Sequence, residues 1–469
     1  MTVPEFFGSK RLFGTARRIA VPTLALLIAG CATASPPPIN PRSASASPPP
    51  AMDRGLEGDV IVLALSGGGA RSTAFSLGAL QGLRDLRARD GRTVLDHVRI
   101  VTAVSGGSIM AAYYGLHGPP GLDTFRAAYL DKDWTAQIHT NLASPLNWAR
   151  AAGGGLNDQV RTSNWLDREV FAHGLMGDLT NRFDVRVVLN ATDLYNGTTF
   201  AFTRTYFDAL CSDLESVRIA DAVAASMAFP GAFHPVVLQT HSGSCPPQPD
   251  WVAAAQPDHG RPALVRRTAQ AFANYRNADR QQFLHLADGG IIDNLGLSSL
   301  RLMRETAGNA FGPLSERDAV RVSRMTFLVV NAEQTREATW QMRASGPNGP
   351  QALSAILGIA IEAPNRGAYD AFALMAAAWE RALRDYRCSL DAQTVERLRG
   401  SLTGWDCRDV HLVVDMISFA DLDAVSRDTL GHVPTSVSLP SRQVDALIAA
   451  GRRLARENPN TLALSVAAP

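Results

Sequence analysis

Two segments near the start of this chain each join an apolar run to a turn of small residues and then to a second, helix-compatible run. In the first, residues 60–65 lead into three glycines at 67–69. In the second, residues 98–104 stop at Ser105, which two glycines follow. Short apolar runs bounded by turn residues predict buried strands. Strand, tight turn and helix in direct succession constrain the chain to a layered α/β fold.

Similar segments alternate along the remaining chain, and they predict a three-layer α/β fold with a central, mostly parallel sheet flanked by helices. No domain boundary is expected after Pro50, so residues 55–460 should form one domain. We expect strands at 60–65, 98–104, 185–191, 199–204, 236–239, 283–287, 326–331 and 411–417. We expect helices at 72–87, 107–116, 219–227, 297–305, 368–387 and 442–456.

Ser105 is the leading candidate for a nucleophile. A serine at the apex of a strand–turn–helix element exposes its hydroxyl on a strained turn, and small neighbours such as Ala103 and Gly107 relieve crowding there. The N–H groups of Gly67, Gly68 and Gly69 are unobstructed and suit the stabilisation of an oxyanion. A tight turn that serves only packing is the alternative for each motif.

Asp288 ends another apolar run and is followed by Gly289 and Gly290, which leave room for a partner to approach closely. Open α/β sheets place their sites at strand ends. Arg71 follows the glycine loop, and we expect it either to orient that loop or to attract an anionic head group. The alternative for Asp288 is a turn-forming aspartate.

Taken together and in this order, these motifs resemble those of the patatin-like phospholipases. The matching segments are Gly67-Gly68-Gly69-Ala70-Arg71, Ala103-Val104-Ser105-Gly106-Gly107, Ala224-Ala225-Ser226-Met227-Ala228-Phe229-Pro230 and Asp288-Gly289-Gly290. Ala103 stands where the family pattern has a glycine. The resemblance implies hydrolysis of lipid acyl esters, with a membrane phospholipid or lysophospholipid as substrate. It also implies a Ser105–Asp288 dyad, an oxyanion hole at Gly67, Gly68 and Gly69, and no metal or organic cofactor.

Two other functions remain open at this stage. A conventional Ser-His-Asp esterase would need a histidine beside Ser105, and chain order would point to His411 or His432. His285 lies within an expected strand and is read as structural. A lipid-binding envelope protein of the same fold, without turnover, is the second. No HExxH motif or CxxC pair supports a metal site.

The N-terminus has the pattern of a targeting segment. Basic residues precede an apolar run at 19–28, which is shorter than the roughly 20 residues that span a bilayer. The run ends in Ile28-Ala29-Gly30-Cys31, which resembles the lipobox of bacterial lipoproteins. We therefore expect a signal peptide over 1–30, a lipid anchor on Cys31 and a Pro/Ser-rich tether over 31–54. Ala32 after the cysteine favours the outer membrane, facing the periplasm.

Charge and cysteine content narrow the choice further. The formal net charge of the 469 residues is +1, which argues against a nucleic-acid partner. Four cysteines follow Cys31, and an exported protein permits disulfides. Proximity in the sequence favours the pairs Cys211–Cys245 and Cys388–Cys407, with four buried thiols as the alternative.

Overall fold

The structure is a computed structural model that describes residues 37–43, 55–132, 134, 155–157, 159–181, 183–241, 245–255, 260–334 and 340–466. The expected signal peptide and Cys31 lie outside these residues. Among the residues described, no helix has both the length and the apolar content needed to cross a bilayer.

Eight strands form one sheet in the order β10-β9-β1-β2-β4-β8-β7, with β5 added to β4. These strands are β1 (Gly58–Leu65), β2 (Val98–Val104), β4 (Arg186–Asp193), β5 (Thr198–Ala201), β7 (Val236–Gln239), β8 (Phe283–Asp288), β9 (Val322–Asn331) and β10 (His411–Ser418). The five strands from β10 to β4 are parallel to one another, whereas β5, β7 and β8 pair in antiparallel fashion. The expected α/β fold with a mostly parallel sheet is confirmed. A separate pair joins β3 (Gly155–Asn157) to β6 (Gly231–Phe233).

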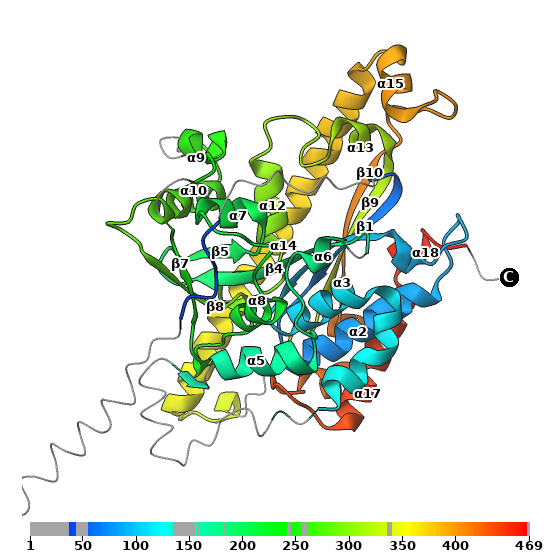
Figure 1. The fold of residues 1–469 in the computed structure, drawn as a ribbon. Helices are drawn as coiled ribbons and strands as arrows, with labels where there is room; N and C mark the ends of the chain where they lie inside the picture. The colour runs from blue at the N-terminus through cyan, green and yellow to red at the C-terminus, as the bar shows by residue number, and fades with distance from the viewer. Residues whose placement is uncertain are drawn as a thin grey trace, which may run out of the picture.

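Helices cover both faces of this sheet, as Figure 1 shows. The α2, α3 and α17 helices lie on one face, and α12 and α14 lie on the other. Their bounds are α2 (Gly69–Asp85), α3 (Gly106–Phe125), α12 (Ser298–Glu305), α14 (Gly349–Ser389) and α17 (Ser441–Glu457). The remaining helices are α5 (Gln159–Glu169), α6 (Asp178–Asn181), α7 (Arg204–Ala209), α8 (Ile219–Ser226), α9 (Asp250–Ala255), α10 (Ala263–Tyr275), α11 (Gly290–Asp293), α13 (Glu316–Arg321), α15 (Ala392–Arg399), α16 (Ala424–Gly431) and α18 (Pro459–Leu462). Single turns occur at η1 (Val94–His97), η2 (Arg126–Leu130), η3 (Trp340–Met342) and η4 (Phe419–Asp421).

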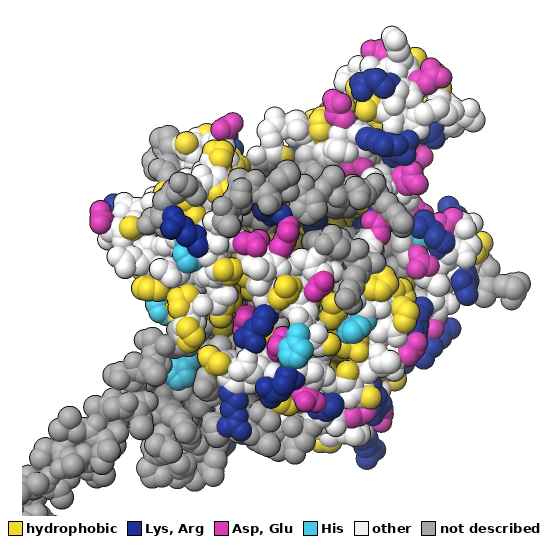
Figure 2. Space-filling view, viewed as in Figure 1, with side chains coloured by type: hydrophobic (Ala, Val, Ile, Leu, Met, Phe, Trp, Pro, Cys, Tyr) yellow, Lys and Arg dark blue, Asp and Glu magenta, His cyan; other side chains and the backbone are white. Residues whose placement is uncertain are grey.

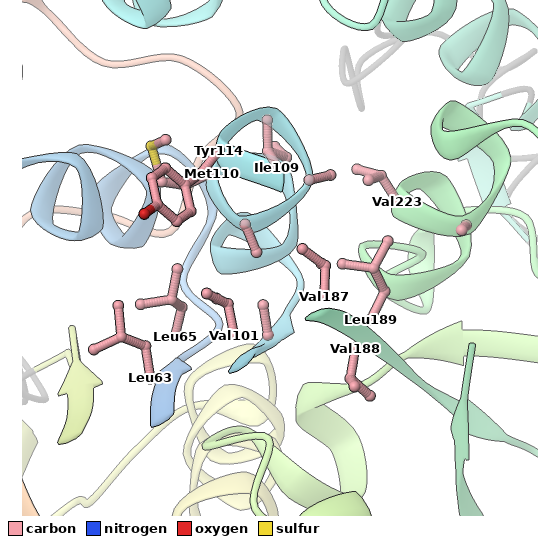
Figure 3. Packing of buried hydrophobic residues seen from close by; sticks show 14 of the residues in the cluster. Leu63, Leu65, Val101, Ile109, Met110, Tyr114, Val187, Val188, Leu189 and Val223 are labelled. Atoms are coloured by element: carbon pink, nitrogen blue, oxygen red, sulfur yellow. The ribbon is translucent and has the colours of Figure 1, made fainter. Parts of the chain in front are cut away.

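Strand β1 contributes to the core on both of its faces, because successive side chains of a strand point in opposite directions. Leu63 and Leu65 pack with the α2, α3 and α17 layer, and Figure 3 draws them with Ile109 and Met110 of α3. Val62 and its alternate neighbours pack instead against α12 and α14. A strand buried on both faces explains why the sequence reads as a continuous apolar run rather than an alternating one.

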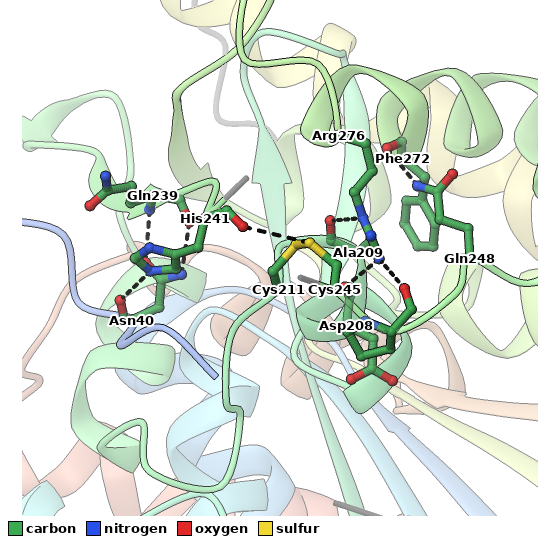
Figure 4. The surroundings of a disulfide bond; sticks show 11 residues. Asn40, Asp208, Ala209, Cys211, Gln239, His241, Cys245, Gln248, Phe272 and Arg276 are labelled. Atoms are coloured by element: carbon green, nitrogen blue, oxygen red, sulfur yellow. Dashed lines mark hydrogen bonds between the residues drawn. A yellow bond between two sulfur atoms is a disulfide. The ribbon is translucent and has the colours of Figure 1, made fainter. Parts of the chain in front are cut away.

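Part of the expected tether is bound to the domain. The side-chain amide of Asn40 donates to the Gln239 carbonyl at 3.0 Å and its Oδ1 accepts the Gln239 N–H at 2.8 Å, while Ile39 N–H donates to the Val237 carbonyl. Ile39 and Asn40 therefore lie along the free edge of β7 (Figure 4), whereas residues 41–43 pair with residues 211–213. Of the tether expected over 31–54, the structure describes only residues 37–43, and the Pro/Ser composition of the segment did not reveal these contacts of Ile39 and Asn40.

Both expected disulfides are present, Cys211–Cys245 and Cys388–Cys407. The first lies beside the bound N-terminal segment, since Ser43 N–H donates to the Cys211 carbonyl (Figure 4). The second joins the end of α14 to the loop before β10 and encloses α15. The expected helix 368–387 is the second half of α14, which begins at Gly349 and contains Pro364.

Residues after 460 also pack against the domain. Leu464 is buried and Val466 N–H donates to the Arg87 carbonyl, so the domain extends beyond residue 460.

On the face seen in Figure 2, Lys and Arg side chains are scattered among Asp and Glu instead of gathering in a basic stripe.

Candidate active site

Ser105 occupies a sharp turn between β2 and α3. Its φ of 51° and ψ of −122° lie where non-glycine residues are uncommon, a strain that occurs mainly at functional sites. The turn is packed closely against neighbouring backbone. A Cβ on Gly106 would stand 2.1 Å from the Gly69 carbonyl oxygen, and one on Gly107 would stand 2.5 Å from that of Leu65. Only glycine fits at either position, which explains the small residues after Ser105.

Asp288 faces Ser105 directly. The Ser105 hydroxyl donates to Asp288 Oδ2 at 2.8 Å, and the Gly290 N–H donates to Oδ1 at 2.8 Å. Both side chains are buried. Burial raises the pKa of Asp288 from 3.8 to about 6, although the hydrogen bonds from Ser105 and Gly290 favour its ionised form. A buried carboxylate with a pKa near neutrality, in contact with a serine, has the properties of a general base.

The antiparallel strand β8 places this carboxylate. Asp288 lies opposite Ala191 of β4 in the register, and the Thr192 hydroxyl donates to the Asp288 carbonyl at 2.9 Å. The Asp288 N–H donates to the Ala228 carbonyl at 2.9 Å. The backbone of Asp288 is thus held from two sides. Gly289 passes close to the Asn190 carbonyl oxygen, which a Cβ would approach to 2.4 Å.

Ser226 holds the turn at Ser105 in place through hydrogen bonds. Its hydroxyl donates to the Asn190 carbonyl at 2.6 Å, accepts the Ser105 N–H at 2.9 Å and lies 2.8 Å from the Ser108 hydroxyl. Ser226 belongs to a segment noted in the sequence only as a motif match, and no role was assigned to it. The structure makes it the residue that positions the Ser105 backbone.

The glycine loop provides two N–H groups beside the serine. Those of Gly68 and Gly69 donate to no acceptor among the described residues, and the Gly69 nitrogen lies 2.8 Å from where a Cβ on Gly106 would stand. The N–H of Gly67, by contrast, donates to the Asn294 carbonyl at 3.0 Å. We therefore correct the expectation that all three glycines supply oxyanion donors: tertiary packing against Asn294 occupies the first.

Arg71 braces this loop from the interior. Its Nε donates to the Ala332 carbonyl at 2.9 Å and its guanidinium to the Val433 carbonyl at 2.6 Å. The side chain is 3% exposed, and burial lowers its pKa to about 10, which leaves it charged near neutral pH. Of the two roles considered for Arg71, the structure supports orientation of the loop, because a buried guanidinium cannot reach a head group in solvent.

Histidines take no part in the hydrogen bonds of Ser105 and Asp288 within the described residues. His285 is exposed on β8, and His411 stands beside Arg384 at 3.3 Å. His432 lies 2.6 Å from the Asp428 carbonyl. The described residues also contain no cluster of three or more His, Cys, Asp or Glu side chains that could hold a metal ion.

One comparison with known proteins identifies the family of this chain. The model of the family described as patatin-like phospholipase matches residues 63–301, which include the glycine loop, Ser105 and Asp288. No curated protein matched the sequence. Among solved structures, the ExoU–SpcU complex of the Pseudomonas aeruginosa type III secretion system matched at 14% identity and a TM-score of 0.21, over 86% of this chain and 78% of that one.

Proposed function

The chain belongs to the patatin-like phospholipase family, a family of lipid acyl hydrolases, and from this premise we propose that it cleaves an acyl ester of a phospholipid or lysophospholipid through a Ser105–Asp288 dyad. The observation that carries the proposal is the 2.8 Å hydrogen bond from the serine hydroxyl to Asp288 Oδ2. No third group intervenes between them among the described residues.

The geometry suggests a two-step reaction. Ser105 Oγ attacks the acyl carbonyl carbon while its proton passes to Asp288 Oδ2, and the N–H groups of Gly68 and Gly69 stabilise the oxyanion. The oxyanion then collapses, the ester C–O bond breaks and the leaving alcohol takes the proton from Asp288. In the second step Asp288 accepts a proton from water as it attacks the acyl-enzyme. Collapse of the second oxyanion releases the carboxylic acid and returns the proton to Ser105.

A set of variants tests the dyad. We expect Ser105→Ala and Asp288→Asn to abolish release of fatty acid from mixed phospholipid vesicles, measured by mass spectrometry, whereas His411→Ala and His432→Ala retain most turnover. Asp123→Asn, an exposed carboxylate 65% accessible, is the matched control. Loss of turnover in a folded His411→Ala or His432→Ala variant would favour the Ser-His-Asp esterase. A folded wild-type protein that cleaves none of these lipids or a fluorescent ester would favour the lipid-binding alternative.

We also propose that Cys31 carries a lipid anchor in the outer membrane, facing the periplasm. Support comes from Ile39 and Asn40, which bond to Val237 and Gln239 and so run in the same direction as β7, with Pro37 toward Val236. Val236 pairs with Leu286, two residues before Asp288. The six steps from Cys31 to Pro37 span at most roughly 20 Å. An anchor at Cys31 would hold the membrane near the end of β8 that bears Asp288.

Fractionation tests the anchor. We expect Cys31→Ala to move the protein from the membrane to the soluble fraction and to remove the mass of the lipid. Ala32→Asp should shift it from the outer to the inner membrane. An unchanged mass and an unchanged membrane fraction in Cys31→Ala would refute the anchor without affecting the dyad.

A further inference from the structure

A cavity lies between the sheet and helices α12 and α14, on the face of the sheet opposite α2. Its volume is about 380 Å³, within the range of roughly 300–1,000 Å³ that is usual for small-molecule sites. Its lining contains neither Ser105 nor Asp288 nor the glycine loop. The cavity is therefore separate from the candidate active site.

The floor of this cavity is a single row of side chains across four strands. Phe327 of β9 pairs with Val62 of β1, Val62 with Ile100 of β2, and Ile100 with Arg186 of β4. Register partners in a parallel sheet project from the same face. The row is thus apolar along three strands and ends in an arginine on the fourth.

The roof is apolar and adaptable. Helix α12 contributes Leu300 and Met303, and α14 contributes Met375 and Trp379. Unbranched methionine side chains adjust to the shape of an apolar ligand. The indole N–H of Trp379 is buried and has no hydrogen-bond partner among the described residues.

Positive charge gathers at the rim. Strand β8 pairs with β4 only from Ala191 onward, so Arg186 stands at a free edge of the sheet. No ion pair or hydrogen bond of Arg186 is found within the described residues. Asp184, two residues earlier, is paired with Arg99 instead. Arg186 is exposed at this edge, and desolvation by the groups around it lowers the pKa of its guanidinium.

The other charged residues of the lining do not neutralise Arg186. Both oxygens of Asp318 accept backbone N–H groups, from Leu56 at 2.8 Å and from Ser315 at 3.3 Å. Arg317 adds a second cation to the rim. An elongated apolar cavity with an unpaired arginine at its edge is complementary to a chain that ends in an anion.

We propose that this cavity binds a single-chain amphiphile with an anionic head group, the chain lying between the sheet and the two helices and the head group meeting Arg186. A free fatty acid and a lipid phosphate with one chain share this chemistry. The proposal does not rest on hydrolysis by Ser105, because the two sites have no residue in common.

Photolabelling with two diazirine-bearing probes tests the site and separates the two sources. One probe is a hexadecanoate and the other a hexadecyl phosphate, and labelled peptides are identified by mass spectrometry. We expect at least one of the two to label the segments that contain Met303 or Met375, and to do so equally in Ser105→Ala. Preference for the carboxylate would identify a fatty acid as the ligand, and preference for the phosphate a lipid phosphate.

Two variants show whether the charge and the cavity matter. Arg186→Gln should lower anionic labelling of these segments by about tenfold or more, the usual effect of one charge-assisted hydrogen bond. Labelling by the neutral hexadecanol analogue should not change. Arg381→Gln, an exposed arginine on α14 outside the lining, should leave all labelling unchanged. Met303→Trp should block labelling by filling the cavity.

Three results would overturn the proposal. They are labelling confined to peptides around Ser105, equal labelling of wild type and Arg186→Gln by both anions, and labelling by hexadecanol as strong as by the anions. Hydrolysis measured on the same samples keeps this outcome distinct from the dyad. Arg186→Gln should retain wild-type turnover, which also shows that the variant is folded.

Discussion

The Ser226 hydroxyl accepts the backbone N–H of Ser105 at 2.9 Å, and it does so while donating to the Asn190 carbonyl at 2.6 Å. One buried hydroxyl thereby ties the serine turn at the end of β2 to the neighbouring strand β4. A backbone at φ 51° persists only when its surroundings hold it. Ser226 supplies part of that restraint although it does not touch the reacting atoms.

Ser226→Ala should lower kcat more than it changes KM. The substitution leaves the Ser105 N–H and the Asn190 carbonyl without their shared partner, and unsatisfied buried groups cost about 1–3 kcal/mol each. The Ser105 hydroxyl would then meet Asp288 in a less favourable geometry, with a kcat loss of about tenfold or more. Steady-state kinetics on a soluble ester would measure this split.

Ser76→Ala is the control for that experiment. Ser76 is also fully buried, but its hydroxyl has no hydrogen-bond partner among the described residues. It should keep wild-type kinetics. Equal kcat values for Ser226→Ala and Ser76→Ala would show that the turn holds its geometry without Ser226.

Activity should fall in acid as Asp288 becomes protonated. The base must be ionised to accept the proton of Ser105, and burial raises its pKa to about 6. We expect kcat/KM to lose a factor of about ten for each pH unit below that value. A pH–rate profile with the protein's folding monitored at each pH would test this. A profile that stays flat down to pH 4.5 would exclude Asp288 as the base.

Asp288→Asn should be inactive but more stable than wild type above pH 6. A carboxyl whose pKa rises from 3.8 to about 6 stabilises the folded state most below pH 4, and this contribution is lost as pH rises through 6. The buried charge then costs up to about 3 kcal/mol, which a neutral asparagine avoids. The difference in unfolding free energy should therefore grow between pH 4 and pH 6, in urea titrations. A difference that is constant with pH would contradict the raised pKa.

Gly68→Ala should reduce turnover by about 10²–10³, the usual cost of misplacing one oxyanion donor. The Gly68 φ of 140° is one that side chains rarely adopt, and the new Cβ would lie 3.0 Å from the Arg71 guanidinium. Gly404→Ala introduces similar backbone strain at φ 67° with no atom within 4 Å. Thermal melting and kcat of the two variants should show comparable stability loss and a difference only in turnover. Full activity in folded Gly68→Ala would remove this loop from the oxyanion hole.

Local sequence pattern predicted several strands well because the signals of a buried strand are local. The expected strands at 98–104 and 236–239 coincide with β2 and β7, and the turn at Ser105 follows β2 as expected. Proximity in the chain also predicted both disulfides. Such features depend on a run of apolar residues, a turn residue or a short loop, all of which are visible in one stretch of sequence.

Contacts between distant segments could not be predicted in this way. The sequence placed Asp288 at the end of a strand but did not show that this strand, β8, is antiparallel and reaches the serine through its pairing with β4. Arg71 could have faced solvent, but its acceptors at Ala332 and Val433 lie more than 250 residues away in the chain. The Gly67 N–H is unavailable to an oxyanion because it donates to the Asn294 carbonyl, which is another contact between distant segments.

Removal of the Cys388–Cys407 disulfide should loosen α15 and spare the active site. The bridge closes a loop of 19 residues, which corresponds to about 3 kcal/mol in the chain-entropy account. The buried apolar cluster at α15 is small and consists of Val320, Val395 and Leu398, and Arg321 donates to the Leu398 and Arg399 carbonyls at the end of this helix. We expect the double variant Cys388→Ala/Cys407→Ala to unfold at lower urea and to be cleaved by trypsin at Arg397 or Arg399, with kcat unchanged. Resistance to trypsin at α15, with an unchanged urea midpoint, would show that the cluster suffices without the disulfide.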